Sequence, residues 1–478
     1  MKIISNKPSI TLVENEHLNS KNLTAHFHKA EYIEIEKKLI SSNLEIKSLK
    51  DLVTKISLGN TGKIMDGYTS DGVPYLTTKN VTENGVDLSK LTFISSEIHN
   101  KKLKNSKVYP KDIIYNKSGN VGLSAIIPID YEEYNLVSDL IYIRPVEKKI
   151  NPYYLVLYLN SNVGKKLSEK QAGGAIFQHI SIYDVGDLQV PVPHKRIQDY
   201  FGNKVLRAEQ LQAEAKLLKV QVDNYITEYL KLDLLKSSIQ SLEVERKWNI
   251  VKIHELHDRL DSEYYKKKYS ILQEHLKQLK KLNIKVLKLK DVIKKGSYGI
   301  LPSSHDYGKG DLAFIRSTDL EDYMINLDSC EKVPMKYNLE KARVSSGEIL
   351  LEIKGAISGG AIVHEDIYEA IVNGSIYKFS VKDEFNNYYI LAILQSLIGE
   401  LQKEKYGANS VISYLSLDVI QNLQIPVLDR SIQDQIGAKL ERFVQSQIEA
   451  KMLIKSANFD VESLIEGTFD ESTIIDME

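Results

Sequence analysis

The sequence predicts an α+β protein built by duplication: two mixed α/β domains separated by two long helices that pair as an antiparallel coiled coil. The first observation is a stretch beginning at Leu188, LQVPVPHKRIQDYFGNK, which returns at Leu423 as LQIPVLDRSIQDQIGAK. Over the 39 positions aligned from Ile180 at a shift of 235 residues, 17 are identical, which indicates a duplication. The second is an apolar heptad pattern that follows both copies. The third is a set of short β-type runs punctuated by turn residues ahead of each copy.

The duplication extends over most of the chain. NPYYLVLYL from Asn151 matches NNYYILAIL from Asn386, and SLKDLV from Ser48 matches KLKDVI from Lys288. So long a period is a domain duplication, since solenoid repeats recur every 20–50 residues or so. We therefore expect six consecutive parts: a helical segment over 1–47, a globular domain over 48–193, a long helix over 194–247, a helical segment over 248–286, a second globular domain over 287–428, and a second long helix with a tail over 429–478.

The long helices are predicted from their apolar spacing. In alternating steps of four and three from Ile197 to Ile239, eleven of thirteen positions are apolar, which predicts a seam along one continuous helix. About 42 residues at 1.5 Å each give a rod of about 60 Å. The same steps run from Ile432 to Ala457. Two seams in one chain most simply pair with each other, and a structural brace is the simplest function of such a pair.

Composition sets the broad class. The 478 residues carry a net charge of −1 and one cysteine, Cys330, so there is no intrachain disulfide and a reducing, cytoplasmic location is expected. No apolar run is long enough to cross a bilayer of about 30 Å, and no signal-peptide core is seen near residue 1. A nearly neutral chain can still bind nucleic acid through a local basic patch.

Motifs for catalysis are weak. NPYY at Asn151 resembles the Asn-Pro-Pro-Tyr/Phe motif of amino-group DNA methyltransferases but lacks the second proline, and a helix start with Asn as N-cap and Pro next explains it better. EIK at Glu352 could end a nuclease metal site, yet the aligned residues at Asn116 are Asn-Lys-Ser. No glycine-rich nucleotide loop or metal-ligand spacing is found. We expect no catalytic residue, metal or cofactor in this chain.

Signals for duplex DNA are stronger. Between Lys50 and Lys117 the chain has 11 lysines and 7 acidic residues; lysines supply affinity through phosphate, while polar side chains read base edges. Loops carrying such side chains differ between the copies although the flanking residues are kept, which favours two domains that recognise different DNA sequences. The alternative is that these polar loops are simply exposed to solvent and bind nothing. The predicted DNA-binding residues are Lys63, Thr78, Lys79, Asn80, Lys101, Lys102, Lys104, Lys107, Lys117, Ser118, Asn120, Gln171, Gln178, His179, Ser303, Ser304, His305, Arg316, Ser317, Thr318, Lys354, Ser358, Tyr406, Asn409 and Ser410.

These residues carry a family resemblance. The order domain, long helix, domain, long helix resembles the DNA-specificity subunit of type I restriction-modification systems. So do GGAIFQHISIYDVGDLQVPVP from Gly173 and NSVISYLSLDVIQNLQIPVL from Asn409. The step from a proline-containing strand into an Ile-Gln helix start is similar to that family's junction between a target-recognition domain and a conserved helix. The family's usual Glu-Gln is Ile197-Gln198 and Ile432-Gln433 here, which leaves the subgroup open.

The resemblance implies a division of labour. Each recognition domain would read one half of a bipartite site in double-stranded DNA, and the helices would set the spacer and dock two copies of an adenine methyltransferase subunit. A restriction-translocase subunit would join them, and catalysis with S-adenosylmethionine, Mg²⁺ and ATP would belong to these partners. The alternatives are the specificity subunit of a type IIB-like system, a self-sufficient DNA methyltransferase or nuclease, and a purely structural coiled-coil scaffold.

Overall fold

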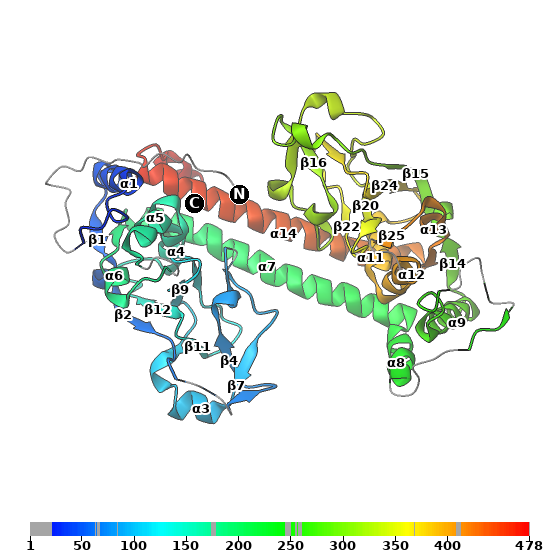
Figure 1. The fold of residues 1–478 in the computed structure, drawn as a ribbon, viewed down its shortest axis with the longest axis horizontal. Helices are drawn as coiled ribbons and strands as arrows, with labels where there is room; N and C mark the ends of the chain where they lie inside the picture. The colour runs from blue at the N-terminus through cyan, green and yellow to red at the C-terminus, as the bar shows by residue number, and fades with distance from the viewer. Residues whose placement is uncertain are drawn as a thin grey trace. The chain divides into compact units, whose positions relative to one another are not determined.

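The structure of the chain is a computed structural model, and it describes residues 22–62, 64, 67–83, 85–173, 178–243, 250–253, 256, 261–367, 369–407 and 413–477. The chain forms two compact units (Figure 1). Unit 1 consists of Met1–Leu211 and Glu449–Glu478, and unit 2 of Gln212–Ile448. The predicted duplication is therefore seen as two units, each with its own sheets and core. No helix within the described part of the chain is both long enough and apolar enough to span a bilayer.

Unit 1 is built around a four-stranded antiparallel sheet in the order β10-β9-β12-β2. Its strands are β2 (Val53–Leu58), β9 (Ile113–Asn116), β10 (Ser124–Ile126) and β12 (Leu140–Pro145). A second sheet has the order β3-β7-β4-β11-β8, with strands β3 (Tyr68–Thr69), β4 (Val73–Leu76), β7 (Thr92–Ile94), β8 (Lys107–Val108) and β11 (Tyr134–Leu136). Two strand pairs complete the unit: β1 (Ile46–Ser48) with β13 (Gln189–Pro191), and β5 (Val81–Thr82) with β6 (Gly85–Val86).

The four-stranded sheet is covered on both faces, which explains why its strands read as continuous apolar runs. Because side chains alternate along a strand, Ile113 and Tyr115 pack with the helical side, in the same cluster as Tyr154 and Tyr158. Ile114 faces the other way, in a cluster with the second sheet. The helices of unit 1 are α1 (Ala30–Ser41), α2 (Leu49–Leu52), α3 (Ser96–Lys101), α4 (Pro152–Asn160), α5 (Asn162–Gln171), α6 (Ile182–Gly186), the first part of α7 (Lys195–Leu230) and the last part of α14 (Arg430–Ile465).

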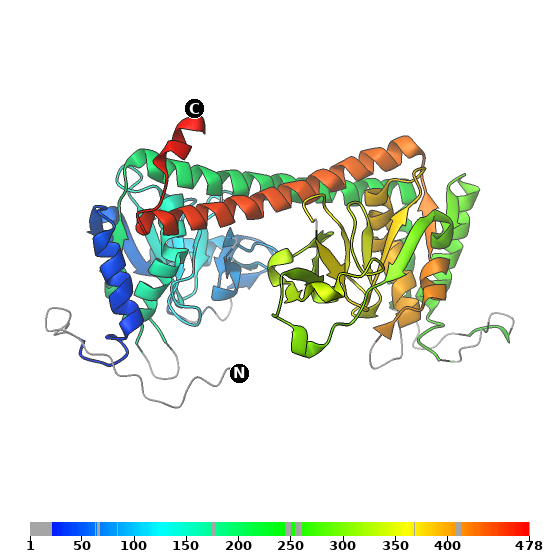
Figure 2. The same ribbon diagram turned by 90° about the horizontal axis from the view of Figure 1, so that it is seen from above.

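Unit 2 repeats this plan. Its four-stranded sheet has the order β15-β24-β20-β22, with β15 (Ile293–Tyr298), β20 (Ile349–Glu352), β22 (Gly360–Ile362) and β24 (Ile376–Val381). The other pairings join β16 (Leu312–Ile315) to β19 (Glu331–Val333) and β23 (Ala370–Val372), β14 (Lys285–Lys288) to β26 (Gln424–Val427), β17 (Leu320–Glu321) to β18 (Met324–Ile325), and β21 (Lys354–Gly355) to β25 (Ser413–Tyr414). The helices are α8 (Leu232–Glu243), α9 (Lys267–Lys281), α10 (Leu289–Val292), α11 (Asn387–Gln395), α12 (Leu397–Gly407), α13 (Leu417–Asn422) and the first part of α14 (Arg430–Ile465). In Figure 2 the strands of each unit lie to one side of that unit's own long-helix segments.

The repeated sequence motif forms the junction between each globular domain and its long helix. In unit 1 the predicted N-cap is confirmed: Asn151 Oδ1 accepts hydrogen bonds from the Tyr153 and Tyr154 amides at 2.9 and 3.3 Å. Asn151 Nδ2 donates to Asp199 Oδ1 on α7 at 2.8 Å, and the Asn151 amide donates to Gln198 Oε1 at 2.9 Å. The same bonds join Asn386 to Asp434 and Gln433 in unit 2, at 3.0 and 3.1 Å.

The two long helices pair in an antiparallel manner within each unit. In unit 1, Lys204 of α7 donates to Ser456 of α14 at 2.9 Å and forms an ion pair with Asp460. In unit 2, the Arg442 guanidinium holds both carboxylate oxygens of Glu214 at 2.9 and 3.0 Å. Rising numbers along α7 thus meet falling numbers along α14, as predicted. Asp460 also explains why a lysine interrupts the apolar seam.

One predicted feature of the seam is wrong. The helix does not continue to Ile239, because α7 ends at Leu230 and Lys231 adopts a left-handed backbone with φ 53° before α8 begins. The apolar spacing persists because Leu232 and Leu235 are buried in the same cluster as side chains of α9. A heptad pattern reports burial on one face and does not specify which helix provides the partner.

Candidate nucleic-acid interface

Several strand ends converge at one edge of the globular domain in unit 1. β4 and β11 are parallel and finish together, and the Val137 amide donates to the Leu76 carbonyl at 3.1 Å. β2 ends beside them, since the Asn60 amide donates to the Leu136 carbonyl at 2.7 Å. A Cβ at Gly59 would lie 2.1 Å from the Val137 oxygen, so only glycine fits where these backbones touch. We call this region, residues 59–60, 76–77, 117–120, 136–139 and 178–180, the strand-end edge.

Two loops predicted to contact DNA lie side by side at the strand-end edge. The Lys117 amide donates to the Asp139 carbonyl at 3.0 Å, and the Ile180 amide donates to the Lys117 carbonyl at 3.1 Å. Ser118 forms a β-bridge with His179, and its hydroxyl donates to Asp139 Oδ1 at 2.9 Å. The fold thus brings together residues about sixty positions apart in the sequence.

Unit 2 has an equivalent edge with the same backbone bonds. The Ile353 amide donates to the Ser375 carbonyl at 2.9 Å, and the Leu415 amide donates to the Ile353 carbonyl at 2.8 Å. In addition, Lys354–Gly355 pairs with Ser413–Tyr414. Each of these positions corresponds to one in unit 1 at a shift of 235 or 236 residues. The backbone is therefore repeated while the side chains that it presents differ.

In the turns after β4 and β16, two of the predicted residues, Asn80 and Arg316, make hydrogen bonds within their own domain. Asn80 is buried, and its amide is fully used: Oδ1 accepts from Thr77, while Nδ2 donates to the Asp87 and Lys90 carbonyls. At the equivalent turn of unit 2, Asp319 is buried and accepts from the Arg316 amide at 2.8 Å. Asn80 and Asp319 each stabilise a 3₁₀ turn. The oxygen and the nitrogen of the Asn80 side-chain amide each make two hydrogen bonds within the domain.

Arg316 is also occupied within its own domain. Its guanidinium donates to both oxygens of Asp319 at 3.2 Å and to the Ser329 carbonyl at 2.9 Å, and it pairs with Glu331 at 3.5 Å. The Asp319 carboxylate raises the pKa of Arg316. These bonds give Arg316 a structural role within its domain, and its contact with DNA stays a prediction.

The lysine-rich segment of unit 1 divides into exposed and tethered side chains. Lys102 and Lys104 follow α3 and are exposed, and Lys101, the last residue of α3, is exposed although it pairs with Glu97 at 3.0 Å. Lys107 differs, because its ammonium donates to Asn100 at 2.6 Å and pairs with Glu133 at 3.1 Å. A contact between Lys107 and phosphate, which stays a prediction, would compete with these two interactions.

The remaining predicted residues lie as follows. The exposed side chains, with the three lysines above, are Lys79, Asn120, Gln178, His179, Ser303, Ser304, His305, Thr318, Lys354 and Ser358. The half-buried ones are Thr78, Lys117, Ser118, Gln171, Ser317 and Tyr406. Lys63, Asn409 and Ser410 lie outside the described residues. The two loops of each edge gather Lys117, Ser118, Asn120, Gln178 and His179 in unit 1, and Lys354 and Ser358 in unit 2.

A buried polar network beneath the lysine-rich segment was not predicted. His99, inside α3, is fully buried, with Nε2 2.8 Å from Glu133 and Nδ1 3.1 Å from the Asn135 amide nitrogen. Burial lowers the pKa of His99, which favours the neutral ring. The Asn135 amide can only donate, so Nδ1 accepts and Nε2 carries the proton toward Glu133. The network anchors the segment that carries Lys102 and Lys104, and no local sequence signal joins residues 34–36 positions apart.

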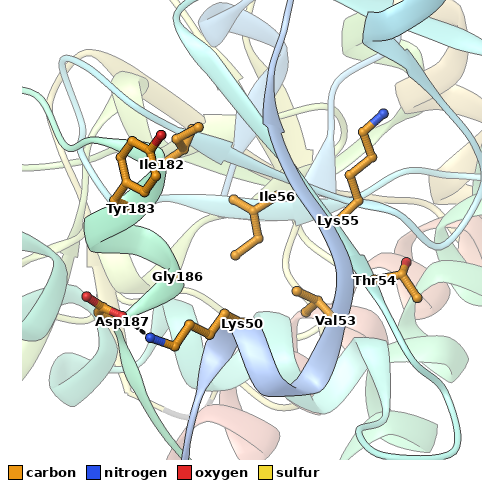
Figure 3. A pocket seen from close by; sticks show the side chains of 9 residues that line it. All are labelled: Lys50, Val53, Thr54, Lys55, Ile56, Ile182, Tyr183, Gly186 and Asp187. Atoms are coloured by element: carbon orange, nitrogen blue, oxygen red, sulfur yellow. Dashed lines mark hydrogen bonds and ion pairs between the residues drawn. The ribbon is translucent and has the colours of Figure 1, made fainter.

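A surface hollow of about 440 Å³ lies elsewhere in unit 1 (Figure 3). Its lining includes Ile56 of β2 and Tyr183 of α6, and Lys50 reaches Asp187 at 2.7 Å along its rim. In unit 2 the residues equivalent to Tyr183 and Asp187 are Asp418 and Asn422. The side chains that line this hollow are therefore not repeated in unit 2. Within the described ranges, no three His, Cys, Asp or Glu side chains gather closely enough to hold a metal ion.

Comparison with known proteins agrees with the duplicated fold. A family model described as "Type I restriction modification DNA specificity domain" matches twice, at residues 41–203 and 281–456. A curated relative from Methanocaldococcus jannaschii, described as a "Putative type I restriction enzyme MjaX specificity subunit", is 26% identical over 158 residues. That match covers 32% of this chain and spans 36% of the relative's length.

A solved structure shares the fold. The S subunit of a type I restriction-modification system from M. genitalium superposes with a TM-score of 0.52 at 13% sequence identity. The match covers 90% of this chain and 97% of that one. At this identity the likeness concerns the fold alone, and it includes both halves of the duplication.

Proposed function

We infer the role of this chain from its family: it belongs to the type I restriction modification DNA specificity proteins, whose model matches well over half of its residues. We propose that the chain is the DNA-recognition subunit of a type I restriction-modification complex. Each globular domain is a target-recognition domain that reads one half of a bipartite site in double-stranded DNA. The chain itself is non-catalytic in this proposal.

The observation that carries this proposal is the pair of equivalent strand-end edges. The backbone bonds at Lys117 and Ile353 are the same, while the neighbouring side chains differ, with Ser118 and His179 in one edge and Lys354 and Tyr414 in the other. Sequence is read by hydrogen bonds from side chains to base edges. One scaffold that presents two different side-chain sets suits two different half-sites.

The long helices supply the docking surface for partners in this proposal. Leu217 on α7 and Met452 on α14 occupy equivalent positions of the repeat, and they are 65% and 62% exposed. Single exposed apolar side chains are ordinary on a protein surface, so what favours docking here is that these two occupy equivalent positions of the repeat. Two equivalent spots support the docking of two copies of one partner, a DNA methyltransferase subunit, with a restriction-translocase subunit joining them. The helices would also set the spacer between the half-sites.

Catalysis then belongs to the partners. Adenine methylation and ATP-dependent cleavage require S-adenosylmethionine, ATP and Mg²⁺, which those subunits would bind. The proposed complex acts on DNA in the cytoplasm.

The test is to express this chain with its partner methyltransferase subunit and to map the methylated bases of the host genome. A two-part motif with a spacer of fixed length is expected. Exchanging residues 48–190 for the first domain of another family member should then change only one half of the motif. A single undivided motif, or a change in both halves, would refute the assignment of one domain to each half.

A further inference from the structure

Glu352 is a buried acid directly beneath the loop 353–359 of unit 2. It is the last residue of β20 and only 6% exposed. Its Oε2 accepts hydrogen bonds from the backbone amides of Ser358 and Gly359, at 3.1 and 3.0 Å. On the other side of the loop, a Cβ at Gly355, where φ is 118°, would lie 2.7 Å from Oε1. The loop therefore closes around this carboxylate.

A buried carboxylate is costly unless it is compensated. Lys403 of α12, which is 2% exposed, provides an ammonium nearby, and the carboxylates that most favour its charged form are Glu400 and Glu352. Burial lowers the pKa of Lys403 to about 8, so it remains mostly charged at neutral pH. Hydrogen bonds to an ionised acceptor are about twice as strong as neutral ones. The loop is thus held by two hydrogen bonds to a buried carboxyl group.

Unit 1 lacks this anchor. The position equivalent to Glu352 is Asn116, and the one equivalent to Lys403 is Ser168. Asn116 is 3% exposed, and its Oδ1 finds no hydrogen-bond partner among the described residues. The two domains share a scaffold at this point. Among the described residues, unit 2 has a buried acid at the end of the strand beneath the loop, whereas in unit 1 the loop bonds to Asp139 through the Ser118 hydroxyl.

We propose that Glu352 is a specificity-determining positioning residue for the second half-site. By fixing the backbone of loop 353–359, it fixes the direction in which Lys354 and Ser358, both exposed, present their side chains. It has no direct contact with DNA in this role. The inference rests on the proposed function, since it assigns this loop to reading bases.

The experiment compares Glu352→Gln with Glu348→Gln in the full chain assembled with the methyltransferase subunit. Glu348 is a matched control: it is 8% exposed, lies just ahead of β20, pairs with Lys378 at 3.0 Å, and bonds to Ser345 rather than to the loop. Two pools of DNA duplexes are the probes. In one pool the first half-site is fixed and the second is randomised, and in the other pool the first is randomised and the second is fixed. Hydrogen exchange of the Ser358 and Gly359 amides is measured in parallel.

Glu352→Gln is expected to reduce discrimination in the second half by about tenfold at one or more base pairs, the size of one lost base preference. The first half should be selected as before, and amide exchange at 358–359 should quicken. Glu348→Gln should change neither readout. If Glu352→Gln fails to fold, Glu352→Asp keeps the charge but is too short for both amides, and it should show the same loss.

Two outcomes separate the ideas. If the unaltered chain selects no two-part sequence from either pool, the proposed function fails. If it does select one, and the variants at 352 and 348 behave alike, the role of Glu352 is refuted while the proposed function stands.

Discussion

Replacing Gly437 by alanine should break the junction between the second recognition domain and α14. A Cβ at Gly437 would lie 2.2 Å from Asn386 Oδ1 and 2.5 Å from its Cγ. Favourable contacts between such atoms lie near 3.5–4 Å, so Asn386 must move by about 1 Å or more. Asn386 also caps α11 by accepting from the Tyr389 amide at 3.0 Å, and it donates to Asp434 at 3.0 Å. Both bonds are lost if it moves.

The magnitude follows from these contacts. Overpacking of a close site costs about 1–3 kcal/mol and loss of an N-cap about 1 kcal/mol, whereas alanine is better than glycine inside a helix by about 1 kcal/mol. We therefore expect Gly437→Ala to destabilise the region by about 1–3 kcal/mol. With Asn386→Ala already present the clash is gone, and Gly437→Ala should stabilise by up to about 1 kcal/mol. The two changes are thus coupled by about 2–4 kcal/mol.

The assay is native-state hydrogen exchange of α11 and α14 amides under increasing urea, because a chain with two units need not unfold in one step. Gln435→Ala, an exposed change on the same turn of α14, is the control and should be neutral. Gly202→Ala in unit 1, where Asn151 would be 2.7 Å away, should act in the same direction but less strongly. Additive effects of Gly437→Ala and Asn386→Ala would refute the reasoning.

Three further predictions concern binding and helix ends. Lys104→Ala should weaken the binding of the assembled complex to cognate and scrambled DNA alike, and should reduce the salt dependence of the binding constant by about one unit of slope. Gln178→Ala should cost about 1–3 kcal/mol of binding free energy on cognate DNA only. A salt titration of binding to both duplexes distinguishes the two variants, and the opposite pattern would mean that Lys104 reads bases and Gln178 contacts phosphate. Leu217→Glu and Met452→Glu should each remove one methyltransferase subunit, read by native mass spectrometry, and unaltered stoichiometry would place docking elsewhere. Lys231→Gly should stabilise the chain by about 1 kcal/mol, because a left-handed backbone costs a residue with a side chain about that much and costs glycine little. A loss of stability in urea unfolding would contradict this.

The sequence predicts the secondary structure and the duplication of this molecule well because both depend on local sequence patterns. Short β-type runs between turn residues predict strands, the Asn151 motif predicts a cap, and the repeated helix start predicts equivalent junctions. These signals depend on neighbours in the chain or on the repeat itself.

The chemistry of single side chains is less predictable, since it depends on partners that only the fold supplies. By its residue type Arg316 suits hydrogen bonds to base edges, but in the folded domain its guanidinium pairs with Asp319 and Glu331. Lys107 belongs to a lysine-rich run, yet Glu133, 26 residues away, holds it. The end of α7 escapes detection for a similar reason, because the apolar pattern continues while the packing partner changes.

The division of the chain bears on the order in which it can fold during synthesis. Unit 2 is one continuous stretch, Gln212–Ile448, so all of its core has been synthesised before residue 449 is added. Unit 1 is not, because Val461 and Leu464 of α14 belong to the same core as Ile35 of α1. Translation of the first 211 residues therefore leaves an apolar surface uncovered until the last part of α14 arrives. The second domain to be made is the first that can be finished, and a chain stopped near residue 448 would expose the core of the first.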